Sequence, residues 1–178
     1  MLKVLTEGCE PKRATKFSAA IDLFAAEDVV IGTGETAKIP LGIAIDINSL
    51  RVNKDSFGEA IMMEVFMSKH YLQVSPRSSL GLKGLIIPNG IGIIDLDYKG
   101  EICLILHRPF TLKTVWEIVN KAFIRFRGGD IEKYEFDRGH VIQKGDKIAQ
   151  IMLCEHKSYL MGYDSEEERV GGFGSSGN

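Results

Sequence analysis

Two carboxylates stand within an apolar run in the middle of the chain. Asp95 and Asp97 lie in residues 92–100, a segment rich in isoleucine that also holds Tyr98. An ionised carboxylate among isoleucines is costly to bury unless it is paired, so it is either a turn residue or a base that takes a proton from water. Strict strand alternation places Asp95 and Asp97 on one face and Tyr98 on the other. From this segment alone, solvated aspartates at a sheet edge are the simpler interpretation.

A second polar segment, residues 75–81, suits the oxygens of a phosphate group. It places the guanidinium of Arg77 beside the hydroxyls of Ser78 and Ser79, directly after a proline that fixes the backbone. An arginine fork with neighbouring hydroxyls and amides binds phosphate oxygens well. By itself, however, the segment is typical of an ordinary polar turn.

Three further segments carry polar groups. Asp22 stands between apolar neighbours in residues 19–26, and Gln150 precedes an apolar run. Residues 171–177 offer many backbone amides, and their one ring, Phe173, is suited to stacking on a base. This is not a Walker loop, because no lysine follows it. Taken alone, the first two are typical of strands and the third of a mobile tail.

The elements that must position these groups are short apolar runs rich in valine and isoleucine. Glycine, proline, asparagine and aspartate bound them, as in residues 31–34 and 88–90. The runs cover residues 29–31, 41–47, 85–87, 91–96, 102–106 and 147–153. This spacing predicts an all-β fold, a jelly-roll-like β-sandwich or barrel. A chain of 178 residues without a linker rich in Pro, Gly or Ser fits a single domain over residues 1–178.

Two stretches, near 48–70 and 108–138, interrupt the strand pattern. Residues 56–70 suit a short helix, and residues 111–126 suit an amphipathic one, although Ile118 and Ile124 interrupt its polar face and leave a strand open for part of it. We expect one or two short inserted helices that pack on the main core, because large exposed apolar patches are uncommon. The helical steps of three and four residues in the second stretch join Leu112, Val115, Trp116, Val119, Phe123 and Phe126.

Charge and composition exclude several classes of function. The chain has 22 Lys and Arg against 24 Asp and Glu, so it has no general electrostatic attraction for a nucleic-acid polymer. No run approaches the roughly 18 apolar residues of a membrane-spanning helix. Cys9, Cys103 and Cys154 form no CxxC pair, which indicates reduced thiols and a cytoplasmic location. The four histidines show no metal-ligand spacing, which argues against a zinc site held by the protein.

Taken in order, the five polar segments resemble the five motifs of the trimeric dUTPase (dUTP diphosphatase) family. They are residues 20–26, 76–81, 92–100, 145–150 and 171–177. Each motif alone is common, but five in this order along nearly the whole chain are not expected by chance. The resemblance implies a jelly-roll-like subunit, a homotrimer with three shared active sites, and Mg²⁺-assisted hydrolysis of dUTP to dUMP and pyrophosphate.

The resemblance also implies a role for each matching residue. Asp95 would be the catalytic base that deprotonates the attacking water, and Tyr98 the ring under the deoxyribose that leaves no room for a 2′-hydroxyl. Asp22 would meet Mg²⁺ through water, and Phe173 would cap the uracil. The remaining contacts to the nucleotide would come from Asn89, Gly92, Ile93 and Ile94 at the uracil, and from Arg77, Ser78, Ser79, Gln150, Arg169, Gly174 and Ser175 at the phosphates.

The chain departs from the family pattern in three places. Ala20-Ile21 stand where the first motif usually has Gly-Tyr, and Glu168 stands where the fifth usually has Arg, with Arg169 one residue later. The inserts near 48–70 and 108–138 lengthen two connections, and residues 169–178 form the flexible C-terminal motif. Some bacteriophage members carry an extra segment between the third and fourth motifs, which suggests a phage-type member acting in a host cytoplasm.

Two other functions remain open on the sequence. A dCTP deaminase, or a bifunctional deaminase-dUTPase, resembles the same family in fold and in an Arg-Ser-Ser-Leu segment, although Asp95, Tyr98 and Phe173 favour the dUTPase. A nucleotide-dependent regulatory protein that binds a protein partner through the inserts is the second alternative, and it is compatible with enzymatic activity.

Overall fold

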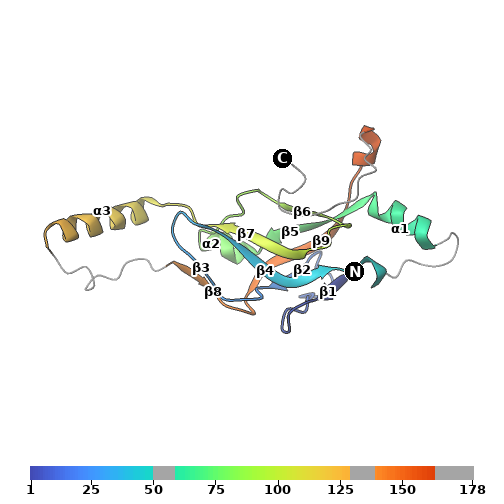
Figure 1. Ribbon diagram of the computed structural model, residues 1–178, viewed down its shortest axis with the longest axis horizontal. Helices are drawn as coiled ribbons and strands as arrows, with labels where there is room; N and C mark the ends of the chain where they lie inside the picture. The colour runs from blue at the N-terminus through green and yellow to red at the C-terminus, as the bar shows by residue number, and fades with distance from the viewer. Residues whose placement is uncertain (50–58, 129–138, 163–178) are drawn as a thin grey trace.

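The computed structural model describes residues 1–49, 59–128 and 139–162. Two of its sheets pack face to face, and a third, two-stranded sheet lies beside them (Figure 1). In spatial order, the first sheet holds β1 (Leu2–Val4), β4 (Thr36–Ile45) and β7 (Glu101–His107), the second holds β2 (Ile21–Phe24), β9 (Lys147–Glu155), β5 (His70–Pro76) and β6 (Gly92–Asp95), and the third holds β3 (Val29–Ile31) and β8 (His140–Ile142). All strand pairs are antiparallel, and the prediction of an all-β, jelly-roll-like sandwich is confirmed.

Alternating apolar residues on the facing strands build one continuous core. On β7, Ile102, Leu104 and Leu106 are fully buried, while the residues between them are half-buried. Strand residues alternate between faces, so this pattern directs every second side chain of β7 into the core. The core cluster also takes in buried residues of β2, β4, β5 and β9. Two separate sheets thus share a single core, which fixes the positions of the polar segments at their edges.

The predicted strands are found with shifted ends. The run at 29–31 is β3, and the runs at 91–96, 102–106 and 147–153 contain or lie within β6, β7 and β9. The run at 41–47 belongs to β4, which begins earlier at Thr36, and its last residue starts the 3₁₀ helix η1 (Ile47–Ser49). The prediction of a strand at 85–87 is wrong, since only Ile86 forms a bridge, to His107. There the Leu85 amide donates to the Leu80 carbonyl and closes a turn instead.

Three α-helices leave the sandwich at different places. α1 (Glu59–Met67) precedes β5, and α2 (Ser78–Leu82) follows it directly. Phe66 and Met67 at the end of α1 pack against the core, as expected for the first insert. A second 3₁₀ helix, η3 (Ser158–Met161), follows β9. Among residues 1–49, 59–128 and 139–162, no helix combines the length and apolar character needed to cross a membrane.

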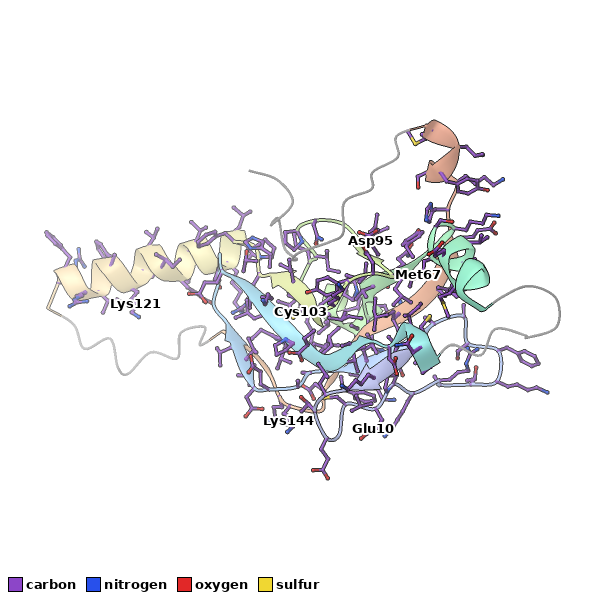
Figure 2. The ribbon with its side chains drawn as sticks, turned by 45° about the vertical axis from the view of Figure 1, so that its right-hand side comes forward. Glu10, Met67, Asp95, Cys103, Lys121 and Lys144 are labelled. Carbon is purple, nitrogen blue, oxygen red and sulfur yellow. The ribbon has the colours of Figure 1, made fainter. Side chains whose placement is uncertain are left out.

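The second insert forms α3 (Leu112–Phe126), a helix that projects from one end of the molecule (Figure 1). The ring of Phe110, just before the helix, lies against Gly34, where an added Cβ would be 2.3 Å from the ring. The expectation that this helix packs on the core of its own subunit is wrong, because Trp116 is 67% exposed and Phe126 is 88% exposed. Its side chains radiate away from the two sheets (Figure 2). A helix joined to the body only at one end cannot lay an apolar stripe on that body.

Candidate active site

A buried carboxylate with two cations marks one edge of the second sheet. Asp22 on β2 is only 7% exposed, the one buried polar residue in the described part of the chain. Arg77 Nη1 and Lys147 Nζ each lie 3.5 Å from Asp22 Oδ2. At this distance the pairs are ionic rather than good hydrogen bonds. We call these three residues the Asp22 cluster. Because the carboxylate is buried and the cations are partly exposed, it holds two positive heads at the surface.

The register of three strands places other predicted residues beside the Asp22 cluster. Asp22 lies opposite Gln150 on β9, and Gln150 lies opposite Ser75 on β5. Directly opposed residues share one face of an antiparallel sheet, so these side chains form a row across β2, β9 and β5. The Arg77 amide donates to the Ile148 carbonyl at 2.9 Å and fixes the end of β5 against β9.

The predicted proline-fixed turn continues into a short helix. Pro76 ends β5, and Ser78 and Ser79 open α2 with both side chains exposed. Leu80, two residues further on, is buried in the core and anchors the helix. The structure therefore brings the first, second and fourth predicted segments together, with two hydroxyls, two cations and one amide side chain close to one another.

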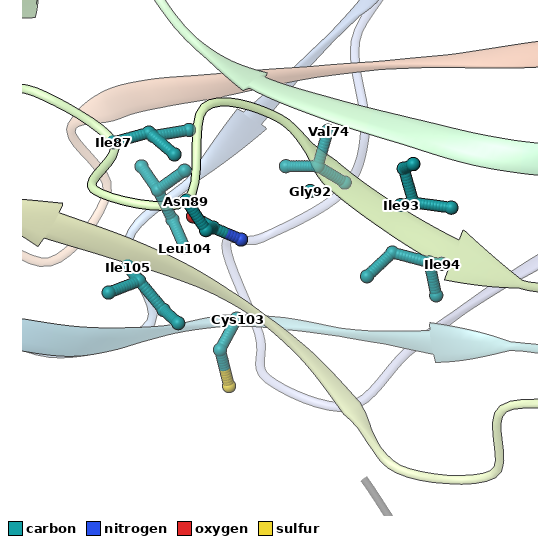
Figure 3. Close-up of a pocket in the computed structure, with 9 residues that line it drawn as sticks. All are labelled: Val74, Ile87, Asn89, Gly92, Ile93, Ile94, Cys103, Leu104 and Ile105. Atoms are coloured by element: carbon teal, nitrogen blue, oxygen red, sulfur yellow. The ribbon is translucent and has the colours of Figure 1, made fainter. Parts of the chain in front are cut away.

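A pocket of about 150 Å³ lies between the two sheets, where β6 and β5 face β7 (Figure 3). All four residues that the sequence analysis assigned to uracil contact line it. Figure 3 shows the Asn89 side chain directed from its loop toward β6. In the described sheet β6 pairs only with β5, so its outer edge offers backbone donors and acceptors. The lining comprises Val74, Ile87, Asn89, Gly92, Ile93, Ile94, Cys103, Leu104 and Ile105.

Cys103 is a pocket residue that the sequence analysis did not assign. Burial raises the pKa of its thiol, an effect that nearby Lys38 opposes and Glu101 supports. The thiol is therefore protonated at neutral pH, and its Sγ donates to the Glu101 carbonyl at 3.5 Å. The pocket is lined by apolar and uncharged groups, which suits a neutral heterocycle rather than a phosphate.

Asp95 and Tyr98 lie in one turn between the sheets. Asp95 is the last residue of β6 and is exposed, and the Tyr98 amide donates to its carbonyl at 3.1 Å. The Tyr98 hydroxyl donates to the Glu101 carbonyl at 3.2 Å. The expectation of strand alternation through Asp97 is wrong, because this turn ends β6 at Asp95. A base and a ring are thus held in fixed relation by a short stretch of backbone.

The pocket and the Asp22 cluster are separate within one chain. Asp95 lies opposite Tyr71 on β5, whereas Gln150 lies opposite Ser75, four residues along the same strand. Four residues span about 13 Å, and the two strand spacings from β6 to β9 add about 10 Å across the sheet. A single water molecule cannot touch Asp95 and a phosphate group held at Gln150 across this separation.

Sequence reasoning missed Lys147 as well as Cys103. Lys147 lies in the segment 145–150 that was recognised, but only Gln150 was given a role there. Its signal was present, since a lysine three residues before Gln150 falls beside Asp22 once a bulge shifts the register. The candidates Arg169, Phe173, Gly174 and Ser175 lie outside the described residues.

No three His, Cys, Asp or Glu side chains in the described ranges come together as a metal site. Mg²⁺ in nucleotide enzymes usually keeps several waters and takes one or two carboxylates together with substrate phosphates. The single buried carboxylate of Asp22 fits that mode, in which the nucleotide brings the ion. It does not fit a metal held by the protein alone.

Comparison with known proteins gives a consistent set of relatives. No family model matches the chain. It is 33% identical over 177 residues to the deoxyuridine 5′-triphosphate nucleotidohydrolase of Rickettsia canadensis, covering 96% of this chain and 89% of that protein. The enzyme of the same name from Rickettsia felis is 34% identical over the same share, and that from Tolumonas auensis is 30% identical over 174 residues.

Solved structures share the fold at lower identity. The dUTPase of Streptococcus mutans matches with a TM-score of 0.55 at 21% identity, over 86% of this chain and 94% of that one. The dUTPase from phage phi11 of S. aureus, described for its species-specific insert, matches with a TM-score of 0.57 at 21% identity, over 98% and 97%. The fold of this chain is therefore similar to bacterial and phage structures alike.

Proposed function

The chain belongs to the family of deoxyuridine 5′-triphosphate nucleotidohydrolases, or dUTPases, and from this we propose how its residues divide the work between base and phosphates. It is an enzyme that hydrolyses dUTP to dUMP and pyrophosphate. In our proposal the uracil and deoxyribose bind at the pocket and turn around β6, and the triphosphate binds at the Asp22 cluster. The observation that carries this division is the pocket itself, whose lining includes all four residues assigned to the uracil.

The uracil half uses backbone and an amide side chain. Asn89 and the outer edge of β6 at Gly92, Ile93 and Ile94 present donors and acceptors in fixed positions. Uracil and cytosine differ in which edge atoms donate and which accept, and a rigid edge rejects the wrong pattern because its own groups would be left unpaired. Tyr98 would lie under the deoxyribose and exclude a 2′-hydroxyl.

Asp95 is our candidate for the catalytic base. Its side chain is exposed at the end of β6, next to the pocket, and it follows two isoleucines that fix the strand. A carboxylate there can accept the proton of a water molecule as that water attacks a phosphorus atom. The phosphate being attacked must come to Asp95, because the Asp22 cluster of the same chain is too far away.

The phosphate half relies on placed charges rather than on a basic surface. Arg77 and Lys147 present positive heads that the buried carboxylate of Asp22 holds in place. Gln150, Ser78 and Ser79 add neutral donors. This agrees with a formal net charge of −2, which leaves anion binding to local groups. We also assign Arg169, Gly174 and Ser175 to the phosphates and Phe173 to the uracil, from the motif resemblance alone.

We propose Mg²⁺ as the metal that accompanies the triphosphate, with Asp22 meeting it through water. When bound, the ion would neutralise phosphate charge and favour the departure of pyrophosphate. The lone carboxylate in a sheet edge supports this role. A mutant dUTPase from phage phi11, similar in fold, was solved with a structural Mg(II) ion.

A homotrimer with shared sites would bring the two halves together. The separation of about 13 Å along β5 and about 10 Å across the sheet leaves each half incomplete in one chain. In a closed symmetric ring, the Asp22 cluster of one subunit faces the pocket of the next, and every contact repeats three times. We also place the enzyme in a cytoplasm, since Cys9, Cys103 and Cys154 are free thiols and reduced thiols are typical of that compartment.

Turnover measurements test the proposal. We expect pyrophosphate release from dUTP that depends on Mg²⁺ and is far faster than release from dCTP, dTTP, dATP or dGTP. An ammonia assay with dCTP measures deamination in the same samples. Hydrolysis of dCTP or dTTP as fast as that of dUTP would contradict the base-reading role of the pocket, and ammonia release would indicate the deaminase alternative.

A second function is favoured by α3, whose apolar side chains are exposed. The helix carries Lys113, Lys121 and Arg125 against a single acid, Glu117. We propose that it binds a protein partner that has an apolar groove with an acidic rim, as amphipathic helices commonly do. Phage dUTPases of the same fold have been described as controlling the transfer of virulence genes.

The partner proposal has a direct test. A variant with Trp116→Ser and Phe123→Ser should keep dUTP turnover and lose a partner that co-purifies with the wild-type enzyme from its own cells. If no protein co-purifies with the wild type, or if the variant retains it, α3 is not the docking surface.

A further inference from the structure

The ring of Tyr98 occupies the space that a side chain at residue 100 would need. A Cβ built on Gly100 would lie 2.5 Å from the Tyr98 hydroxyl oxygen and 2.7 Å from Cζ. Real Cβ contacts are not found at such distances, and optimal carbon contacts lie near 3.5–4.0 Å. Any side chain at this position must therefore displace the ring by about 1 Å.

The backbone of Gly100 gives no other reason for a glycine. Nine glycines in the described chain have positive φ angles, and Gly100 is not one of them. Its conformation is thus open to any residue, and the missing side chain itself is what matters. The glycine is explained by the ring that lies against it.

Hydrogen bonds hold the ring in that place from both ends. The Tyr98 amide donates to the Asp95 carbonyl at 3.1 Å, and the Tyr98 hydroxyl donates to the Glu101 carbonyl at 3.2 Å. Glu101 is itself fixed, because its Oε1 accepts a hydrogen bond at 2.9 Å from the Gly42 amide on β4. The hydroxyl is therefore tied, through Glu101, to the neighbouring sheet, with Gly100 directly below the ring edge.

We propose that Gly100 is a positioning residue for Tyr98 and thereby sets the selectivity of the enzyme for dUTP over UTP. This inference rests on the proposed role of Tyr98 under the deoxyribose. Exclusion of one hydroxyl group depends on the fit of ring against sugar, and a misplacement of about 1 Å in an active site can cost about a hundredfold in rate. A displaced ring loses its contact with deoxyribose, whereas UTP does not make that contact. The ratio of kcat/KM for dUTP to that for UTP therefore falls whichever way the ring moves.

The test compares Gly100→Ala with two other variants. We expect Gly100→Ala to fold as the wild type does and to lower the dUTP-to-UTP ratio of kcat/KM by about tenfold or more. Tyr98→Phe removes only the hydroxyl anchor and should lower the ratio less. Gly81→Ala is the matched control, because its Cβ would meet no atom within 4 Å, and it should keep the wild-type ratio.

The outcomes separate this inference from the proposed function. Wild-type enzyme that prefers dUTP over dCTP and dTTP supports the proposed function whatever Gly100→Ala does. A folded Gly100→Ala enzyme with an unchanged ratio would overturn the positioning role. If Gly100→Ala does not fold, Tyr98→Phe decides, and an unchanged ratio there overturns the role of the hydroxyl anchor and with it the inference.

Discussion

Asp95 lies directly opposite Tyr71 across the antiparallel pair of β5 and β6, four residues along β5 from the position opposite Gln150. The strand geometry keeps the candidate base and the candidate phosphate ligands apart in every copy of the chain. An active site that needs both must therefore be completed by another subunit. This relationship leads to the first prediction.

Mixing two inactive variants should restore activity. Asp95→Asn disables the pocket half of a site, and Arg77→Ala disables the phosphate half. In trimers reassembled from equal amounts of both, about a quarter of the sites would combine an intact Asp95 from one chain with an intact Arg77 from the next. We expect about a quarter of wild-type dUTP turnover after denaturation and refolding of the mixture. No recovery would indicate that each site lies within one chain, and light scattering on a sizing column checks the trimer independently.

Asp95→Asn by itself should fold normally and lose dUTP turnover by about a hundredfold or more, because an amide cannot take a proton from water. Steady-state kinetics measure the loss, and circular dichroism checks the fold. Glu64→Gln is the control, since it neutralises an exposed carboxylate on α1, away from the pocket. Turnover near the wild-type level in Asp95→Asn would place the base at another residue.

Trp116→Ser should change the free energy of unfolding of the isolated chain by no more than about 0.5 kcal/mol, as is usual for exposed positions. Leu104→Ala, in the core, should cost about 2–5 kcal/mol. Urea denaturation measures both. A cost of several kcal/mol at Trp116 would mean that the helix is covered in the assembled enzyme, by a neighbouring subunit or by a partner. Quenching of Trp116 fluorescence by acrylamide then shows whether the ring is shielded.

Phe173→Ala should reduce the catalytic efficiency toward dUTP without affecting the fold. Stacking of an aromatic ring on a base contributes roughly 1–3 kcal/mol in nucleic-acid sites. Phe17→Ala is the matched control, because that ring is exposed and lies far from the five motifs in the sequence. Truncation before Gly171 should have a larger effect than Phe173→Ala. Equal activity of the truncated and full-length enzymes would remove the C-terminal motif from the site.

Much of this protein follows from local patterns in its sequence. The alternating apolar residues of β7 and the valine and isoleucine of β3 specify strands, because side chains on a strand alternate between two faces. The spacing of Leu112, Trp116 and Phe123 likewise specifies a helix, and five ordered segments identify the family. These signals lie within a few residues of one another, so they can be read before the chain folds.

Only the tertiary structure decided which segments meet. Antiparallel pairing of β2, β9 and β5 puts Asp22 beside Gln150 and Arg77, and a bulge brings Lys147 to the same carboxylate. The apolar stripe of α3 predicted burial, but the helix leaves the sandwich at Phe110 and its stripe stays exposed. The contact between Tyr98 and Gly100 depends on a turn closed by the Asp95 carbonyl, which strand alternation did not predict. Register, turns and exit directions are set by packing between distant residues, and no local pattern encodes them.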